Sequence, residues 1–424
     1  MVALDDPVTV GGCRLPNRLY RAPVLECAGT GEGAVDTLVA ELEPTAASGV
    51  GLVFQGASVV TPDGGCAVPN MTRVHDPAFV SSLSRLTGAV HDHGGRIFLQ
   101  LAHGGLRTRS LWHRQYARES GQLAVSEPPV TVRALDQLGV LSLDAHVLST
   151  AEVEELAEQF GRAAGLAADA GYDGIHLSGA NMGIVQQFLS PQFNRRDDAY
   201  ADGVRFLERV HDAVRAHAGD VPLVTKVPAE TQAPRWVRRR LSLADAVSIC
   251  ERLAASGYDG LVPVEVSTFC DMSIVRGAYP ARAWAHEDLR AGYREAWGRR
   301  WRLVALLNRL QSRRFDREPG WNARFCRQVR ERVDVPVFCE GGVRERDHCD
   351  RLLGDACDAV GMARPFYAEP RLGRRLLGDD PDARALCRSC NNCTVPQVTG
   401  ADGRCRTPSV LRERARRERE GAYE

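Results

Sequence analysis

The chain has 424 residues, enough for one large α/β domain or two ordinary ones, and its 44% hydrophobic and 25% charged content is typical of globular proteins. Its 54 basic and 54 acidic residues cancel, which argues against a global attraction to nucleic acid or acidic lipid. No apolar run approaches the roughly 20 residues that cross a bilayer, and the N-terminus lacks an export signal. We therefore expect a cytoplasmic protein with neither a nucleic-acid nor a membrane partner.

A hairpin is predicted first, over residues 8–15, with Gly11 and Gly12 at its turn. Eight short apolar runs follow, each succeeded by a longer stretch with helical spacing. Runs this apolar, without strict alternation, suit strands buried on both faces of a parallel sheet. The predicted strands cover residues 19–24, 51–55, 96–101, 174–178, 222–227, 260–264, 336–340 and 359–362.

The helices between these strands carry recognisable end signals. Ser149 and Glu152 have the spacing of a capping box, and Gly171 supplies the stop of the same helix. Eight alternating β and α units favour a closed (β/α)₈ TIM barrel over an open sheet. We therefore predict an α/β fold in which residues 1–380 form the barrel with its N-terminal hairpin cap.

Residues 266–320 form a long insertion after the sixth strand, well beyond usual connection lengths. A lid that recognises an anionic or bulky aromatic substrate is the favoured interpretation, because the insertion follows a catalytic-face end of the barrel. Nucleic-acid contact, or a partner-docking or membrane-surface helix around 301–310, are the alternatives. The insertion interleaves arginines with aromatics: Arg276, Tyr279, Arg282, Trp284, Tyr293, Arg294, Trp297, Arg300 and Trp301.

Residues 381–424 form a C-terminal extension with a cysteine cluster and a charged helix over 411–420. The thirteen cysteines are odd in number and are not spaced like a disulfide framework. Three cysteines at two-residue gaps followed by a fourth favour an iron–sulfur site over zinc, with four unliganded thiols as a third alternative. The predicted ligands are Cys387, Cys390, Cys393 and Cys405.

Several separated motifs occur in a familiar order: Pro16-Asn17-Arg18, Ala22-Pro23-Val24, Gln100-Leu101-Ala102-His103-Gly104-Gly105, Gln187-Phe188-Leu189-Ser190-Pro191, Glu340-Gly341-Gly342 and Gly361-Met362-Ala363-Arg364-Pro365. With them the chain resembles the Old Yellow Enzyme family of NADH:flavin oxidoreductases over about residues 5–406. The cysteine cluster resembles that of its iron–sulfur branch, which includes 2,4-dienoyl-CoA reductase and trimethylamine dehydrogenase.

The resemblance implies FMN at the mouth of the barrel. Its ring would be lined by Pro23, Val24 and Ala57 and bonded at its pyrimidine edge by Gln100. Lys226 falls where the family usually has an arginine beside the ring, and a cation there stabilises the anionic reduced flavin.

The phosphate site follows from barrel geometry as well, because phosphates commonly bind after strands seven and eight. Gly341 and Gly342 end the seventh strand, where bare backbone can approach a phosphate. Ala363 and Arg364 end the eighth and would supply an amide and a forked cation.

The fourth strand departs from the family pattern, in which two side chains grip a substrate carbonyl and a tyrosine donates a proton. Ser178 and Asn181 occupy the gripping positions, and Gly183 occupies the tyrosine position. Strand alternation places His176 on the inner face with Ser178, either as an acid–base group or as a buried structural histidine. Glu26 and Cys27 are further candidates near the reactive edge.

These features predict an FMN- and [4Fe-4S]-dependent oxidoreductase that reduces a C=C bond conjugated to a carbonyl or thioester. Electrons would come from NAD(P)H or from a separate electron-transfer protein, because the chain ends before the second dinucleotide-binding module of the large relatives. Oxidation of an amine or C–H bond and a non-catalytic electron carrier are the alternatives. A homo-oligomer is a further possibility that these features neither predict nor exclude.

Overall fold

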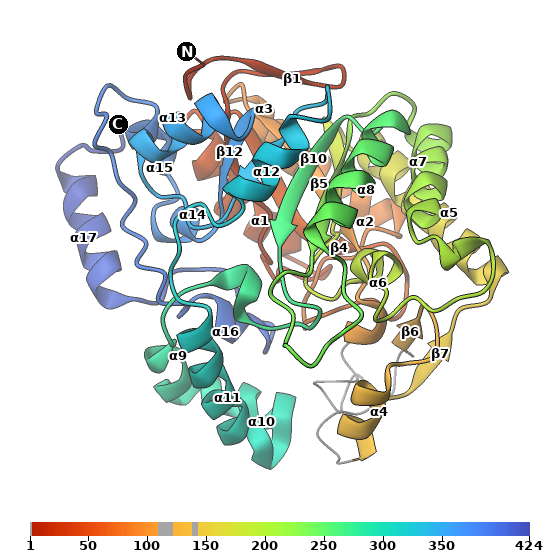
Figure 1. Cartoon of the computed structure of the whole chain (residues 1–424). Coiled ribbons are helices and arrows are strands. Elements are labelled where there is room, and N and C mark those ends of the chain that lie inside the picture. The colour runs from red at the N-terminus through yellow and green to blue at the C-terminus, as the bar shows by residue number, and fades with distance from the viewer. Residues whose placement is uncertain (1, 109–121, 138–142) are drawn as a thin grey trace.

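The computed structural model describes residues 2–108, 122–137 and 143–424, and its centre is a parallel eight-stranded barrel (Figure 1). The sheet order is β10-β9-β8-β5-β4-β3-β12-β11, and Leu261 N donates to Pro336 O (3.0 Å) to close the ring. The eight predicted strands are confirmed as β3 (Leu19–Arg21), β4 (Leu52–Val59), β5 (Arg96–Ala102), β8 (Gly174–Leu177), β9 (Leu223–Ala229), β10 (Gly260–Glu265), β11 (Phe338–Glu340) and β12 (Ala359–Met362).

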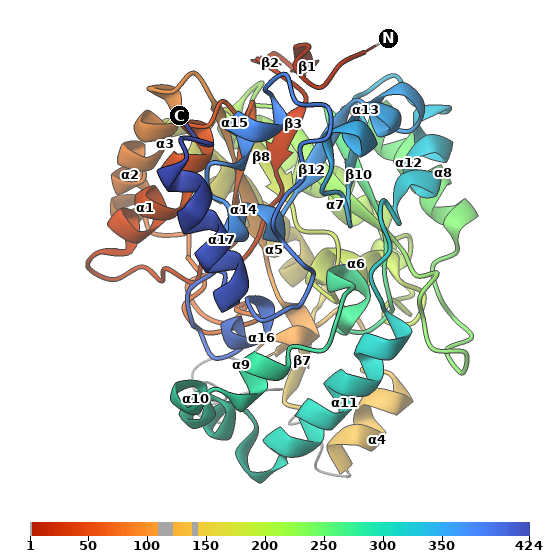
Figure 2. The same ribbon diagram turned by 90° about the vertical axis from the view of Figure 1, so that its left-hand side faces the viewer.

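The predicted hairpin is also confirmed: β1 (Val8–Val10) pairs antiparallel with β2 (Cys13–Leu15). It lies across the end of the barrel where the strands begin (Figures 1 and 2). Val10 and Leu15 are fully buried and join the cluster of side chains that fills the barrel interior. The hairpin therefore closes the amino-terminal end of the barrel. A ligand-binding site is then left to form at the carboxyl ends of the strands.

Helices surround the barrel. The long helix α5 (Thr150–Asp169) begins with the predicted capping box, in which Glu152 N donates to Ser149 Oγ (3.3 Å) and Ser149 N donates to Glu152 Oε2 (2.7 Å). The remaining surrounding helices are α1 (Ala34–Ala46), α2 (Pro77–Ser82), α3 (Ser84–His91), α6 (Ile184–Leu189), α7 (Val204–Ala218), α8 (Leu243–Ala255), α12 (Ala323–Arg330), α13 (Arg346–Asp355), α14 (Arg364–Ala368) and α15 (Leu372–Leu376).

One excursion was not predicted. After β5, the strands β6 (Gln122–Ala124) and β7 (Ala145–Val147) form a separate parallel pair, with α4 (Val130–Gln137) between them. Strands of three residues are too short for alternation to be read from the sequence, so the apolar pattern gave no signal there.

Aromatic rings fill the lower layer of the barrel, nearest the hairpin. Phe54 packs edge-to-face on Tyr20 (5.6 Å between ring centroids) and on Phe98 (5.6 Å), and Tyr20 packs on Phe338 (5.3 Å). Edge-to-face contacts of this kind are favourable beyond their buried area. This layer of packed rings fills the barrel interior on the hairpin side, so any ligand cavity must lie on the opposite side, at the carboxyl ends of the strands.

The insertion after β10 contains helices α9 (Ala281–Ala285), α10 (Glu287–Trp297) and α11 (Trp301–Arg314), which project from the carboxyl end of the barrel (Figures 1 and 2). Its own small core contains Trp284, Tyr293 and Trp297. Beyond β12 the chain passes the cysteines into α16 (Thr394–Gln397), beside α9, and ends with α17 (Pro408–Arg419). Within the described residues, no helix is both long and apolar enough to cross a membrane.

Candidate active site

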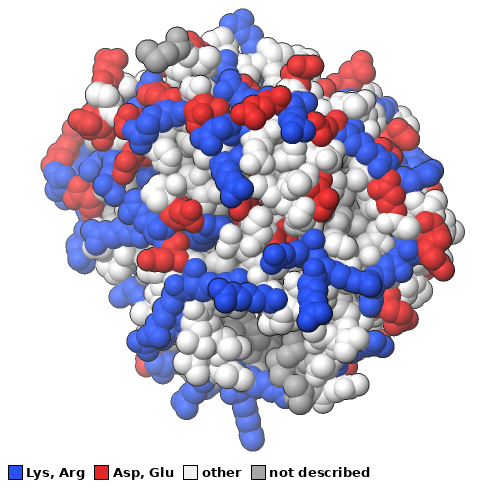
Figure 3. Space-filling view, viewed as in Figure 1, with Lys and Arg blue, Asp and Glu red and all other residues white. Residues whose placement is uncertain are grey.

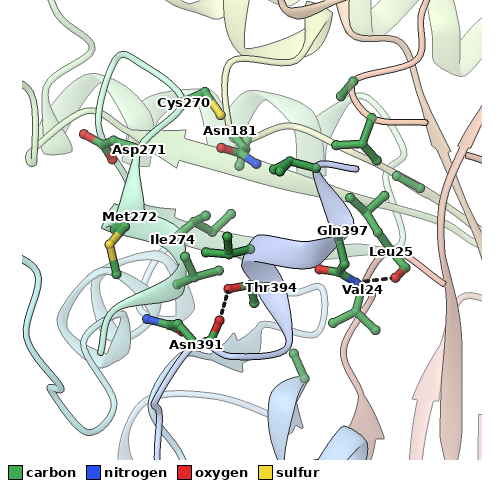
Figure 4. Close-up of a pocket in the computed structure, with 18 of the residues that line it drawn as sticks. Val24, Leu25, Asn181, Cys270, Asp271, Met272, Ile274, Asn391, Thr394 and Gln397 are labelled. Atoms are coloured by element: carbon green, nitrogen blue, oxygen red, sulfur yellow. Dashed lines mark hydrogen bonds between the residues drawn. The ribbon is translucent and has the colours of Figure 1, made fainter. Parts of the chain in front are cut away.

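A cavity of about 1150 Å³ lies at the carboxyl ends of the strands. All nine residues expected to contact FMN line it, although they come from widely separated parts of the chain: Pro23, Val24, Ala57, Gln100, Lys226, Gly341, Gly342, Ala363 and Arg364. Figure 4 shows Val24 and Leu25 on one side and Asn181 with Cys270, Asp271, Met272 and Ile274 toward the other, with α16 between them. Ser178 and Asn181, the expected substrate-gripping residues, line the same cavity.

The segment after β3 is held close to β4 by the absence of a side chain at Gly56. A Cβ there would lie 1.4 Å from Val24 O, so only glycine allows this approach. The Gly56 N–H donates to both carboxyl oxygens of Glu26, at 3.1 and 3.0 Å. Glu26 is buried and does not line the cavity, so it supports the Pro23–Val24 wall from behind.

Lys226 and Glu340 form an ion pair inside the cavity, with 2.5 Å between Nζ and Oε1. Both side chains are almost fully buried. Oε2 of Glu340 has no hydrogen-bond partner and remains free to accept one. The cation expected beside the flavin ring is therefore present, but it carries its own counter-charge, which the sequence interpretation did not include.

Gly341 and Gly342 are required by the backbone as well as suited to a phosphate. Their φ angles are +115° and +74°, in the region that favours glycine. A Cβ would lie 2.7 Å from the Trp321 ring at Gly341 and 2.1 Å from Glu318 O at Gly342. The two glycines thus form a tight turn, and this turn lines the cavity.

Two buried guanidinium groups lie at this end of the cavity. Arg364 donates to Arg276 O (2.9 Å), Val275 O (3.2 Å) and Asn391 Oδ1. Arg344 donates to Gly342 O (3.1 Å) and Ser389 Oγ, while its Nε has no partner. Within the described residues neither arginine forms a salt bridge, and burial lowers the pKa of Arg344. The Cys387 thiol beside Arg344 opposes this shift, and within the described residues no carboxylate pairs with either guanidinium. Because buried charges are costly, two cations without carboxylate partners fit an anion such as a phosphate at this end of the cavity.

The structure does not place His176 in the cavity. Its ring packs against Phe54 (5.1 Å between centroids) and burial lowers its pKa well below the ordinary value. Its Nδ1 lies 2.9 Å from Gln100 Nε2, so the histidine positions the amide that does line the cavity. Its Nε2 has no partner. Strand alternation gave the correct face but not the depth along the barrel axis.

Asn181 is held in one orientation by Arg107. Its Oδ1 accepts from Arg107 Nη1 (2.7 Å) and Nη2 (3.2 Å), which leaves the amide N–H₂ as a donor. Asn181 and Met182 both have φ of +60°, a strained conformation that occurs at functional sites. Gly183 lines the cavity without a side chain, so no proton donor stands at this position.

Titratable cavity residues that the sequence interpretation had not assigned include Asp271 and His103. Burial raises the pKa of Asp271, whose carboxylate also accepts from Ser273 N (2.9 Å). Burial lowers the pKa of His103 to about 4, and its Nδ1 accepts from Gly105 N (3.0 Å). His103 lies inside a recognised motif, whereas Asp271 lies in the insertion, where no motif marks it.

The four predicted metal-ligand cysteines line one small hollow next to the main cavity. Ser389 and Asn391, between them in the chain, have φ of +54° and +56°, which turn the backbone around the hollow. Burial and the neighbouring Cys387 raise the pKa of Cys393 to about 12. Cys390 Sγ lies 3.0 Å from Thr407 Oγ1. The two hollows share Arg364, Tyr367 and Asn391 as lining residues.

The described residues contain no group of three His, Cys, Asp or Glu side chains arranged to hold a metal ion. A tetrahedral zinc site with Zn–S bonds of about 2.3 Å needs its sulfurs in such a group. A cubane places each cysteine on a separate iron, so its ligands converge on a shared hollow at wider spacing. The four thiols around one shared hollow are a donor set that could hold a cluster.

Comparisons with known proteins identify the family of the chain. The profile of the NADH:flavin oxidoreductase / NADH oxidase family matches residues 3–235. The chain is 27% identical over 421 residues to 4,4'-dithiodibutanoate disulfide reductase from Rhodococcus erythropolis, covering 98% of each chain. It is 24% identical over 413 residues to cinnamate reductase from Clostridium sporogenes, covering 91% of this chain and 54% of that one.

Among solved structures, histamine dehydrogenase from Rhizobium sp. 4-9 superimposes with a TM-score of 0.73 at 22% identity, covering 97% of this chain and 53% of that one. This similarity shows the barrel fold. The chain spans about half the length of several curated relatives that it matches. With a matching profile over more than half of its length, the chain belongs to the NADH:flavin oxidoreductase / NADH oxidase family of flavin-dependent enzymes.

Proposed function

We propose that this enzyme binds FMN and a [4Fe-4S] cluster and reduces a C=C bond conjugated to a carbonyl or thioester. The observation that carries the proposal is the convergence of the nine expected FMN-contacting residues on one cavity, next to the hollow of the four cysteines. When bound, FMN would supply hydride transfer and the cluster single-electron transfer.

The side chains divide into a ring end and a phosphate end. We assign Gln100 and Lys226 to the edge of the flavin ring and Ala57, Pro23 and Val24 to its faces. Arg344 joins the assigned Gly341, Gly342, Ala363 and Arg364 at the phosphate. This extension rests on the guanidinium of Arg344, which is buried, lines the cavity and has no carboxylate partner within the described residues.

Ser178 and Asn181 are the proposed donors to a substrate carbonyl, with Arg107 fixing the Asn181 amide. Because Gly183 has no proton to give, another acid must protonate the substrate carbon. Asp271 is our candidate, since it lines the cavity and its raised pKa keeps it protonated closer to neutral pH.

The four cysteines are the proposed ligands of the cluster. Arg364, Tyr367 and Asn391 border both hollows, so a cluster and a flavin would be separated by one layer of side chains. Electrons would come from NAD(P)H or from a separate protein. Family membership, and the relatives' names, favour an enzyme over a carrier.

Oxidation of an amine or C–H bond is the second candidate. Gly183 favours it, because dehydrogenation needs no proton donor at that position, and the structurally similar histamine dehydrogenase acts on an amine. Reduction of a disulfide, as named for the relative of equal length, likewise needs no protonation of carbon.

The cofactor assignment is tested by the visible spectrum of anaerobically purified protein. We expect flavin bands with a broad shoulder that dithionite bleaches, and loss of the shoulder alone in Cys390→Ala. Cys13→Ala, another half-buried cysteine outside the cluster, is the matched control and should keep both features. A colourless, zinc-containing preparation would refute the cluster.

The substrate assignment is tested by turnover with NADH or NADPH. The panel of substrates contains cinnamate-type acids, enoyl thioesters, 4,4'-dithiodibutanoate and methylated amines. We expect the unsaturated compounds to be reduced. Turnover confined to amines with an added electron acceptor would establish the dehydrogenase alternative instead.

A further inference from the structure

Helix α11 presents an unusual stripe of exposed leucines. Among the described residues, seven large hydrophobic side chains are strongly exposed, and four of them are Leu303, Leu306, Leu307 and Leu310, at 45–54% exposure. Their spacing places all four on one side of the helix. Scattered exposed leucines need no explanation, but four on a single helical face form an apolar patch that something covers.

The charged residues of α11 and its two ends are all basic. Residues 298–315 contain six arginines and no acidic residue, although the whole chain is neutral. Arg302 lies over the Trp301 ring (5.6 Å) and Arg309 over the Tyr279 ring (5.9 Å). Within the described residues, Arg302, Arg309 and Arg313 form no salt bridge, so their charges are available to an outside partner.

A second basic segment adjoins α11. Arg314 Nη2 donates to Gln232 O (2.7 Å) and Ala233 O (3.2 Å), which fixes the loop that continues into 235–240 beside the end of the helix. That loop adds four arginines and Trp236, which is 59% exposed. In Figure 3 the lower part of the face, over the insertion, shows mostly basic and uncharged side chains with little red.

We infer that α11 and the 235–240 loop dock the enzyme on an anionic lipid surface. An amphipathic helix with arginines flanking an apolar stripe lies in a membrane interface with the stripe in the acyl boundary and the cations at the headgroups. A second copy of the chain is a poorer occupant, because a two-fold contact would bring the same uncompensated arginines together.

The docking face is continuous with the active site. Leu303 and Leu307 line the main cavity as well as the exposed stripe, and Arg299 and Arg300 line it beside them. A docked enzyme would therefore open its cavity toward the lipid. The neutral total charge, which argued against a membrane partner, hides this local excess. The inference does not depend on the proposed reaction.

The test is co-sedimentation of the purified holoenzyme with vesicles of phosphatidylcholine, alone or mixed with phosphatidylglycerol. We expect binding to the anionic vesicles that weakens as salt is raised. Leu306→Ser/Leu310→Ser, which leaves the cavity lining intact, should weaken binding by about tenfold or more. Arg302→Gln/Arg309→Gln/Arg313→Gln should weaken it by at least about tenfold.

Two controls make the result specific. Leu306→Met/Leu310→Met keeps the patch apolar and should bind like the wild type. Arg412→Gln/Arg416→Gln/Arg419→Gln removes three exposed arginines from α17 and should also bind like the wild type. Flavin content and thermal unfolding verify that every variant is folded.

The inference is overturned if the wild type does not co-sediment with the anionic vesicles. It is equally overturned if the leucine variant binds as tightly as the wild type, since the attraction would then be purely electrostatic. A stable dimer in solution that the leucine variant converts to monomer, without vesicle binding, would assign the stripe to a second copy.

Discussion

The ammonium group of Lys226, on β9, lies 2.5 Å from Oε1 of Glu340, at the end of β11. The two strands flank β10, and the two side chains are 7% and 13% exposed. A lone cation beside a flavin ring stabilises its anionic reduced form, whereas a cation already paired with a carboxylate does so less. In the proposed site, the carboxylate of Glu340 would therefore make the midpoint potential of bound FMN lower than it would be beside Lys226 alone.

Glu340→Gln should therefore raise the midpoint potential of bound FMN, by about 30 mV if the carboxylate costs the reduced flavin about 1.4 kcal/mol. Equilibration with a reference dye measures the shift. Glu345→Gln, in the same segment but half-exposed and paired with Arg384, is the control and should leave the potential unchanged. An unchanged potential in Glu340→Gln would mean that the flavin ring lies away from the pair.

Arg344→Gln should weaken FMN binding by about tenfold or more, because it removes a buried cation from the phosphate end. Riboflavin, which lacks the phosphate, should bind the variant and the wild type equally. Fluorescence titration of the apoprotein with each ligand measures both affinities. Arg351→Gln, an exposed arginine, should behave like the wild type. Equal losses for FMN and riboflavin would refute the phosphate assignment and indicate a structural role.

Gly183→Tyr should fold and should increase reduction of conjugated C=C bonds. A Cβ at this position would meet nothing closer than Ala180 O at 3.4 Å, and the backbone φ is −68°, so a side chain is accommodated. We expect the stability to change by about 1 kcal/mol or less. Gly183→Phe fills the same space without a hydroxyl and should gain nothing. Equal activities of the two variants would show that a proton donor is not what this position lacks.

The stability of the fold should depend on the protonation of Glu26. Burial and the neighbouring Glu41 raise its pKa to about 8, and burial raises that of Glu41 to about 7. A carboxyl whose pKa is raised on folding stabilises the fold fully below its unfolded pKa near 4.5, and this stabilisation is lost as the pH rises through the folded value.

Glu26→Gln should therefore match the wild type at pH 5 and exceed its free energy of unfolding at pH 9, by roughly 2–4 kcal/mol. Urea unfolding at the two pH values measures the difference, with the exposed Glu32→Gln as control. A constant difference at both pH values would show that Glu26 does not titrate in this range.

The sequence predicted the barrel well because buried parallel strands produce apolar runs that need no partner to be recognised. It missed β6 and β7, whose three residues each cannot display a period. It identified the cavity residues through short motifs at strand ends, where position in the barrel follows from position in the chain.

Pairings across the barrel were beyond sequence reasoning. Glu340 directly precedes the recognised glycines and Arg344 follows two residues later, yet nothing local shows that one neutralises Lys226 and the other is buried without an acid. His176 shows the same limit. The alternation of side chains along a strand predicts that His176 faces the barrel interior, but it does not predict how far along the barrel axis the side chain lies. Such relationships arise only when segments more than a hundred residues apart come together.

The carbonyl of Leu25 accepts hydrogen bonds from Tyr367 Oη (2.9 Å) and from Gln397 Nε2 (2.5 Å), residues 342 and 372 positions later in the chain (Figure 4). The segment after β3, which lines the cavity, is thus held in place by two segments that lie far from it along the chain. In the proposed flavin site, a change that removes these two donors would therefore loosen the wall of the cavity without altering any residue assigned to the flavin ring.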